Sequence, residues 1–223
     1  MKRGLKWGLW LIALLAVSLG LYTLGGWIDA RRDAPALKAE IAALDAKARG
    51  VSMLTPRQRS ILLKVEDPAF LTHNGADWST PGAGNTTITQ GLAKKLAFTK
   101  FKPGLRKFRQ TAYAMSLEQQ LSKQDILTLF SNRAEFGRKA NDREWVKGFP
   151  EAAQAFFGKP LSELSEDEYI ALVATLVSPA KFNPDHRTQA FDERIARIKR
   201  LVAGQCAPRD HGDVMLEGCA SYA

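Results

Sequence analysis

The stretch from Trp7 to Ile28 contains no charged residue and is dominated by apolar side chains. A helix of this length crosses the roughly 30 Å of hydrocarbon in a bilayer. A cleaved signal peptide has an apolar region of only about 7–15 residues that ends at a small-residue site, and this stretch continues past that length. The sequence therefore predicts a retained transmembrane anchor. The alternative, a helix buried in a soluble core, needs packing partners that a short chain barely supplies.

The charges around this stretch predict its orientation. It is preceded by Lys2, Arg3 and Lys6 and followed by Arg31 and Arg32. Because Lys and Arg favour the cytoplasmic side, the cluster before the stretch sets the direction, although the pair after it weakens the bias. We expect residues 1–6 to form a cytoplasmic tail and residues 7–28 a single pass through the cytoplasmic (inner) membrane. The rest of the chain would lie outside the cytoplasm.

The remainder of the 223-residue chain is long enough for one ordinary domain. We expect residues 29–54 to form a stalk or first helix, residues 55–204 the domain and residues 205–223 a C-terminal tail. Lys and Arg number 32 against 23 Asp and Glu, a net charge of +9. This excess favours an anionic partner such as phosphate, nucleic acid or a lipid surface, and charge alone does not choose among them.

Apolar residues in the domain recur with the period of α-helices, and no segment alternates convincingly as a strand would. Thr55 as N-cap and Pro56 at the first helical position predict a helix that ends at Glu66. Ser165 with Glu168 forms a capping box for a later helix. Further helices are expected over roughly 88–98, 105–121, 123–132, 151–157, 166–177 and 189–203. The predicted fold class is all-α.

Two cysteines, Cys206 and Cys219, lie near the C-terminus. An oxidising compartment would allow them to form a disulfide that closes a short loop. They could equally be two free thiols. Neither is surrounded by metal-ligand spacing, and the three scattered histidines give no zinc site.

Five segments follow one another in a fixed order that a generic helical protein does not explain. They are EDPAFLTHNGAD from Glu66, TTITQGLAKK from Thr86, RKFRQTAYAMSLE from Arg106, KQDILTLFSNRAEFG from Lys123, and GFPEAAQAFFGKPLSELSEDEYIALVATLVSPAKFNP from Gly148. In this order the segments resemble the motifs of the peptidoglycan glycosyltransferases, glycosyltransferase family 51, which includes the monofunctional biosynthetic transglycosylases. The likeness runs from about residue 62 to residue 184.

The resemblance implies a lysozyme-like helical domain that polymerises lipid II, a lipid-linked disaccharide pentapeptide, into glycan strands at the outer face of the membrane. It implies that Glu66 is the general base, which takes the proton from the acceptor sugar's 4-hydroxyl during an inverting attack on the donor. The implied partners are the lipid-linked precursor and the membrane. Contacts with other cell-wall synthesis proteins are a further expectation.

A run of basic residues free of acids follows the second motif and suits a pyrophosphate leaving group, because cations stabilise phosphate oxygens. The candidates that match family positions are Lys94, Lys102, Arg106 and Lys107. The alternative interpretation is a solvated basic face. Aromatic residues interleave with these cations, which suits a lipid interface. Single-stranded nucleic acid would also suit them, but we expect none outside the cytoplasm.

Polar residues of the first two motifs complete the candidate substrate-binding set. They are Asp77, Thr86, Thr87 and Gln90, and Gln110 of the third motif is a further candidate. Hydroxyl and amide groups can orient a sugar or a phosphate, and in the second motif they can also cap the helix that follows. Both roles can hold at once.

Two departures from the family pattern affect the site. The third motif of the family ends in a Glu, usually treated as a second catalytic-site carboxylate, and this chain has Gln110 there. An amide neither takes a proton nor ligates a cation well, so a divalent metal is left open and no cofactor is expected with certainty. The connection from Asp77 to Asn85 is also shorter than usual and lacks the helix that the family carries there.

These departures keep alternatives to an active polymerase open. One is a catalytically weakened or inactive relative that binds glycan or lipid-linked precursor and regulates cell-wall synthesis. Another is a glycan-cleaving enzyme with the same cleft, which would need a general acid aimed at a bridging oxygen and usually a second carboxylate. The run of basic residues argues against cleavage.

Overall fold

The computed structural model describes residues 2–139 and 144–220, with side chains from Lys6 onward. The regular secondary structure of these residues is helical throughout, and the extended residues form only isolated bridges, Glu135 with Lys147 and Asn183 with His186. The predicted all-α class is therefore confirmed.

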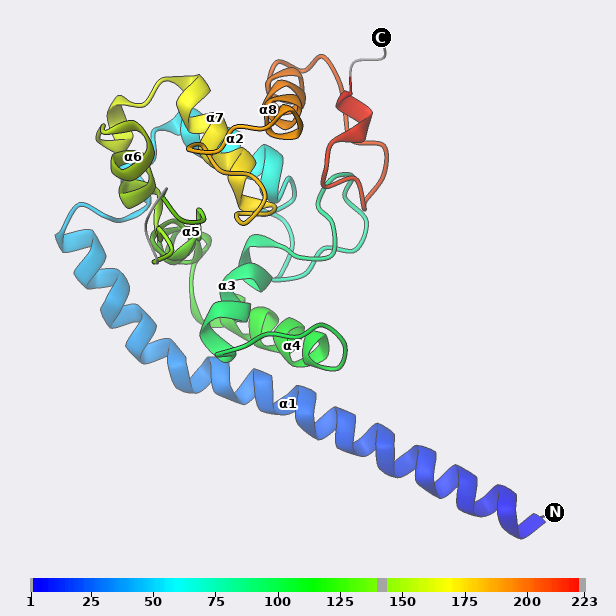
Figure 1. Cartoon of the computed structure of the whole chain (residues 1–223). Helices are drawn as coiled ribbons and strands as arrows, with labels where there is room; N and C mark the ends of the chain where they lie inside the picture. The colour runs from blue at the N-terminus through cyan, green and yellow to red at the C-terminus, as the bar shows by residue number, and fades with distance from the viewer. Residues whose placement is uncertain (1, 140–143, 221–223) are drawn as a thin grey trace.

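Eight α-helices account for most of the described chain. They are α1 (Lys2–Ala46), α2 (Pro56–Glu66), α3 (Ile88–Ala97), α4 (Arg106–Gln120), α5 (Lys123–Arg133), α6 (Phe149–Phe157), α7 (Glu166–Leu176) and α8 (Gln189–Val202). Short 3-10 turns lie at Val51–Met53, Leu161–Glu163 and Glu217–Cys219. Figure 1 shows α1 as a long helix beneath a rounded body, with its N-terminal half projecting away from that body.

Four helices begin with a reciprocal capping box, which fixes where each one starts. The capping residues are Thr55, Thr87, Ser122 and Ser165, paired with Gln58, Gln90, Asp125 and Glu168. In each box the N-cap hydroxyl accepts a backbone N–H, and the side chain three residues later accepts the N-cap N–H. The starts predicted at Thr55 and Ser165 are confirmed.

The expected anchor and the expected stalk form one continuous helix, α1, which runs through Pro35 without a break. Its N-terminal half exposes large apolar side chains, with Trp7 75 % and Trp10 73 % exposed. Among the described residues it is the one helix long and apolar enough to cross a membrane. Residues 29–54, expected to form a stalk or first helix, include a helical part that lies against the domain, with Ala30, Ala34, Leu37 and Ile41 buried.

Helices α1 and α4 pack closely together. A Cβ at Gly26 would lie 2.4 Å from the backbone oxygen of Arg109, so only glycine allows this approach. Ser116 Oγ donates to the backbone oxygen of Trp27 at 2.8 Å. Arg109 forms an ion pair with Asp29. The end of the expected membrane span is thus bound to the domain by both packing and polar contacts.

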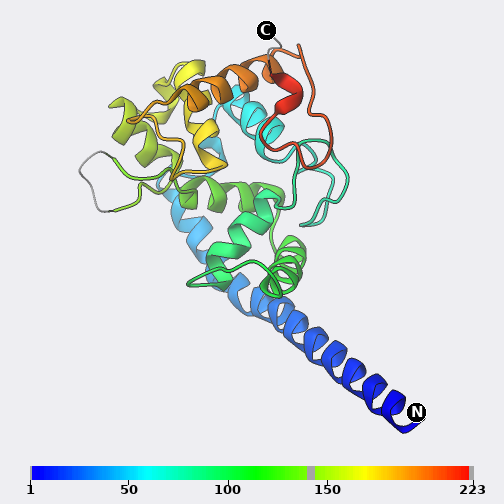
Figure 2. The ribbon, with the colours of Figure 1, turned by 45° about the vertical axis from the view of Figure 1, so that its right-hand side comes forward.

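The helices of the body form two groups. Helix α3 packs on both α4 and α5, and all three contact α1, while α2, α6 and α8 pack around α7. Both groups share one apolar core that includes the buried rings of Phe136, Phe149 and Tyr169. Because α2 ends and α3 begins where the groups meet, the loop between these helices lies at that junction (Figure 2).

Cys206 and Cys219 form a disulfide, which decides between the two alternatives that the sequence left open. We call residues 206–219 the disulfide loop. It packs on α8, where Arg200 Nε donates to the backbone oxygen of Cys219 at 2.7 Å and Arg197 forms a 2.5 Å ion pair with Glu217.

Candidate active site

A cleft of about 500 Å³ opens where the two helix groups meet. Its walls come from the end of α2, the loop before α3, one face of α3, the ends of α5 and α7, and two further residues, Arg194 and Val214. Glu66, Thr86, Thr87 and Lys94 line it, so the fold brings the predicted base together with three predicted substrate-binding residues.

Glu66 is delivered to this cleft by the last turn of α2, and 19 % of its side chain is exposed. Burial raises the pKa of Glu66 to about 7. The positive charge of Arg194 opposes the rise, and the negative charge of Asp67 adds to it. At neutral pH the carboxyl group is thus poised between its ionised and protonated forms, as a general base requires.

Arg194, on α8, is the charged neighbour of this carboxylate. Its Nη2 lies 3.9 Å from Glu66 Oε1, and the side chain is only 2 % exposed. The guanidinium donates to the backbone oxygens of Ala174, at 3.2 Å, and Val214, at 2.8 Å. Sequence reasoning missed this residue. The available signal was a basic residue within the apolar face of its helix, directly before Ile195.

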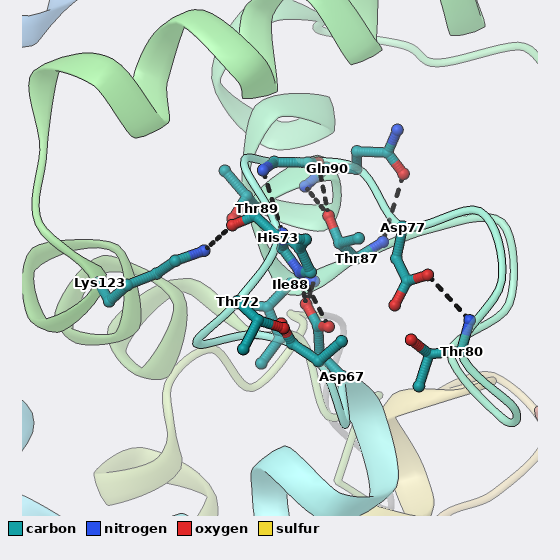
Figure 3. A network of polar contacts seen from close by, with 12 residues as sticks. Asp67, Thr72, His73, Asp77, Thr80, Thr87, Ile88, Thr89, Gln90 and Lys123 are labelled. Carbon is teal, nitrogen blue, oxygen red and sulfur yellow. Dashed lines mark hydrogen bonds and ion pairs between the residues drawn. The ribbon is translucent and has the colours of Figure 1, made fainter.

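Asp67, next to the candidate base, has a structural role (Figure 3). Its carboxylate accepts from the backbone N–H of Ile88 at 2.9 Å and from His73 Nε2 at 2.9 Å. Because the N–H of Gly75 donates to His73 Nδ1, we assign the imidazole proton to Nε2. These contacts join the end of α2 to the start of α3 and so fix the floor of the cleft.

Glu118 belongs to the same network and is held away from solvent, with 5 % of its side chain exposed. Its Oε1 accepts from Thr89 Oγ1 at 2.6 Å and from Lys123 Nζ at 2.8 Å. The ammonium of Lys123 also donates to the backbone oxygen of His73. Glu118 therefore braces the first motif and supplies no free carboxylate.

One of the predicted cations lines the cleft, and a second lies next to its wall. Lys94 lines it, and Lys107 donates to Thr86 Oγ1 at 2.9 Å and to the backbone oxygen of Asn85. Burial, with the nearby charge of Lys94, lowers the pKa of Lys107. The two ammonium groups are thus close enough to repel each other, and an anion bound near both would relieve this repulsion.

The other two predicted cations lie outside the cleft wall, near the turn between α3 and α4. Lys102 is exposed in that turn, and Arg106, at the start of α4, donates to the backbone oxygen of Lys100. Their contact with a phosphate stays a prediction.

Two predicted amide side chains lie in the core behind the cleft. Gln90 caps α3 and donates to Thr111 Oγ1 at 2.9 Å. Gln110 is 1 % exposed, and its Nε2 donates to the backbone oxygen of Gln90 at 2.7 Å. Its Oε1 is buried and has no hydrogen-bond partner among the described residues. Thr87 caps α3 and also lines the cleft, and its contact with substrate stays a prediction.

Asp77 organises the loop between α2 and α3 (Figure 3). Its Oδ1 accepts from the backbone N–H groups of Ser79 and Thr80 at 2.9 and 3.0 Å. Partial burial alone would raise the pKa of Asp77, but these hydrogen bonds lower it to about 2. The residue lies apart from the cleft lining, and its binding role stays a prediction.

The cleft contains a second carboxylate that sequence reasoning missed. Glu135, at the end of the fourth motif, lines the cleft and forms a 2.8 Å ion pair with Lys95. The residue type was visible in the motif, but its direction depends on how α5 meets α3. Among residues 2–139 and 144–220, no group of three or more acidic, His or Cys side chains is placed to hold a metal ion.

Comparison with known proteins identifies the family of this chain. Residues 39–203 match the sequence profile of the family described as transglycosylase. The chain is 28 % identical over 172 residues to a biosynthetic peptidoglycan transglycosylase of Rhodospirillum centenum, an alignment that covers 72 % of each protein. It is 30 % identical over 154 residues to that of Acinetobacter baumannii, which covers 63 % of this chain and 64 % of the relative.

A longer protein is also similar. Penicillin-binding protein 1B of Buchnera aphidicola is 30 % identical over 169 residues, which is 67 % of this chain and 22 % of that protein. The chain therefore spans about a fifth of the length of this relative.

Proposed function

Because the chain belongs to the transglycosylase family of peptidoglycan synthesis, we propose that it is a peptidoglycan glycosyltransferase, which polymerises lipid II with release of the lipid pyrophosphate. The observation that carries the proposal is Glu66, a half-buried carboxyl group in a cleft, with its pKa raised to about 7, together with the ammonium group of Lys94 in the cleft wall and that of Lys107 bonded to Thr86. This arrangement combines a general base with stabilisation of an anionic leaving group.

In the proposed reaction, the 4-hydroxyl of the acceptor sugar gives its proton to Glu66. Its oxygen forms a bond to the anomeric carbon of the donor, with inversion. The bond from that carbon to the pyrophosphate oxygen breaks, and its electron pair leaves with the lipid pyrophosphate. Lys94 and Lys107 stabilise the charge that develops on the leaving group. The positive charge of Arg194, 3.9 Å away, favours the ionised form of Glu66 before it takes the proton.

The anchor supports the same proposal, since the substrate is itself held in a membrane. The apolar N-terminal half of α1 would cross the cytoplasmic membrane, with the domain on the outer side. Because the rest of α1 packs on α4, the cleft would be kept at a fixed height above the lipid. Lys102 and Arg106 would then face lipid headgroups or the pyrophosphate.

Substitution of the candidate base tests the proposal. Purified protein in detergent is incubated with fluorescent lipid II, and glycan products are separated by electrophoresis. We expect Glu66→Gln to lower the rate by about 10²–10⁴-fold, the range that general bases contribute. The control is Glu163→Gln, an exposed site in the turn before α7, which should keep the wild-type rate.

The second candidate is a precursor-binding protein without turnover. The buried position of Gln110 favours it, because the amide offers no acid or base to the cleft. Folded wild-type protein that binds lipid II and never polymerises it would establish this alternative and refute the enzyme.

A further inference from the structure

The disulfide loop lies beside the cleft although it falls outside the part of the chain that matches the family, which ends at residue 203. Val214, within the loop, lines the cleft and is 36 % exposed. The same cleft is lined by Glu66 and by residues of the shortened connection between α2 and α3, including Gly82 and Asn85. A segment with no assigned role thus forms part of the site.

The disulfide loop is bound to the shortened connection by main-chain hydrogen bonds. The N–H of Gly82 donates to the oxygen of Asp210 at 2.8 Å, and the N–H of Gly84 donates to the oxygen of His211 at 2.7 Å. The His211 ring also lies 3.0 Å from the oxygen of Thr80. This connection has no helix of its own between Asp67 and Thr87, so its shape depends on these contacts. Figure 2 shows the two segments side by side.

The loop also holds the residue next to the candidate base. Arg194 Nη1 donates to the backbone oxygen of Val214 at 2.8 Å, and the same guanidinium faces Glu66. The conformation of the disulfide loop therefore bears on both the wall of the cleft and the carboxylate at its floor.

Internal contacts make the loop a defined structure. The carboxylate of Asp213 accepts from the backbone N–H groups of Arg209, Glu217 and Gly218 at 3.0, 2.6 and 2.9 Å. The disulfide joins the two ends of the segment around this carboxylate. Such a segment can act as a fixed wall, which a free tail of the same length could not.

We propose that the disulfide loop is a specificity-determining wall of the cleft, in which Val214 contacts the saccharide part of the substrate. The chemistry of the cleft carries this assignment: Val214 offers methyl groups to the cleft that Glu66 lines, whereas the ammonium groups that suit pyrophosphate come from Lys94, in the cleft wall, and Lys107, bonded to Thr86. An apolar side chain in the same cleft as the base fits the ring of the sugar whose hydroxyl faces that base. The assignment rests on the proposed function for the identity of the substrate.

Two glycines provide a matched test. Gly84 and Gly158 both have a φ of +65°, so alanine strains the backbone equally at each. A Cβ at Gly84 would lie 2.3 Å from Val214 Cγ1, whereas at Gly158 nothing lies within 4 Å. Gly84→Ala therefore displaces the wall, and Gly158→Ala reproduces only the strain.

The first measurement is the dissociation constant of fluorescent lipid II for the detergent-solubilised full chain, which needs no turnover. We expect Gly84→Ala to weaken binding at least tenfold and Gly158→Ala to change it less than twofold. Val214→Ala removes the proposed contact without introducing an overlap and should also weaken binding, by at least threefold. Equal affinities for the two glycine variants, or a wild-type affinity for Val214→Ala, would overturn the proposal.

The second measurement asks whether the disulfide maintains the wall. Dithiothreitol reduces the S–S bond to two thiols and becomes its own cyclic disulfide, and Cys206→Ser/Cys219→Ser opens the loop without a reagent. We expect hydrogen exchange at Gly82 and Gly84 to accelerate at least tenfold in both cases, with α4 and α5 unchanged. Unaltered exchange at these amides would refute the claim that the disulfide loop maintains this wall of the cleft.

These readouts separate the two proposals. Wild-type protein that binds lipid II without polymerising it would refute the proposed function. The affinity and exchange measurements would still decide the role of the disulfide loop.

Discussion

Glu66 has its raised pKa because the protein removes most of its water while Arg194 stays 3.9 Å away, beyond hydrogen-bond distance. The carboxylate must be ionised to accept a proton, and its ionised fraction grows as the pH rises through the pKa. With a pKa of about 7, that fraction is about one tenth at pH 6 and about nine tenths at pH 8. We expect the initial rate of lipid II polymerisation to rise roughly tenfold between these pH values.

An exposed Glu with an ordinary pKa near 4.5 would give a flat profile over the same range. The measurement is the initial rate at saturating lipid II in buffers of equal ionic strength, with circular dichroism at each pH to show that the helices persist. A rate independent of pH from 6 to 8 contradicts Glu66 as the base, or its burial.

Gln110 occupies a position where a carboxylate would be costly. Its Nε2 donates to the backbone oxygen of Gln90, and Gln110→Glu would place an acceptor against that acceptor in the core. We expect the variant to lower the free energy of unfolding by about 1–3 kcal/mol and to leave polymerisation no faster than wild type. Urea unfolding of the detergent-solubilised protein measures the first, and lipid II turnover the second.

The control is Gln119→Glu, the same chemical change at an exposed position of α4, which should be near neutral in both assays. A Gln110→Glu protein that is as stable as wild type and polymerises faster would show that a carboxylate at this position takes part in the reaction at the cleft.

The motif pattern placed Glu66, Thr86, Thr87 and Lys94 among the candidates, and all four line the cleft. The same pattern could not separate them from Gln90, Gln110 and Asp77. Residues one or two positions apart on a helix point to different sides, and only the packing of α3 on α4 decides which side is core. Arg194 was missed for a related reason, since a buried arginine looks in sequence like one more surface cation.

At the scale of elements, the starts of helices were the most predictable feature. Capping boxes are local, so Thr55 and Ser165 reveal them directly in the sequence. The continuity of α1 was less readable, because Pro35 within a helix costs about 3 kcal/mol. The structure offsets this cost by burying Ala34 and Leu37 on either side of the exposed proline, and that contact depends on a helix distant in the sequence.

The contact between α1 and α4 depends on glycine at one point. A Cβ at Gly26 would overlap the backbone oxygen of Arg109 at 2.4 Å, and main chain cannot move aside cheaply. We expect Gly26→Ala to force the helices apart and to lower stability by about 1–3 kcal/mol. Thermal unfolding in a mild detergent, followed by near-ultraviolet circular dichroism, measures the loss.

Gly20→Ala is the matched control, because it lies in the same helix with nothing within 4 Å of its Cβ. Alanine favours helices, so this variant should be neutral or slightly more stable. If both variants unfold at the wild-type temperature, α1 is not held to α4 in the way described.

At the scale of the whole molecule, the apolar surface of α1 continues onto the domain. Leu105 and Phe108, at the start of α4, are 65 % and 52 % exposed, and α4 packs along α1 (Figure 1). Large apolar side chains in such a position are stabilised by lipid and not by water. The domain should therefore rest with this edge in the interface of the bilayer, which would bring Lys102 and Arg106 to headgroup level.

This orientation can be measured with an environment-sensitive fluorophore on an introduced cysteine, since both native cysteines are engaged in the disulfide. In vesicles of bacterial phospholipid, a label at Phe108→Cys should emit at shorter wavelength than in detergent-free buffer and be quenched by nitroxide lipids. A label at Asp192→Cys, exposed on α8 at the opposite side of the body, should show neither effect. Equal quenching at both sites would mean that the domain lies on the membrane in another orientation, and no quenching at either would mean that α1 alone holds it there. Only quenching confined to position 108 agrees with a domain whose height is set jointly by the anchor and by the apolar edge of α4.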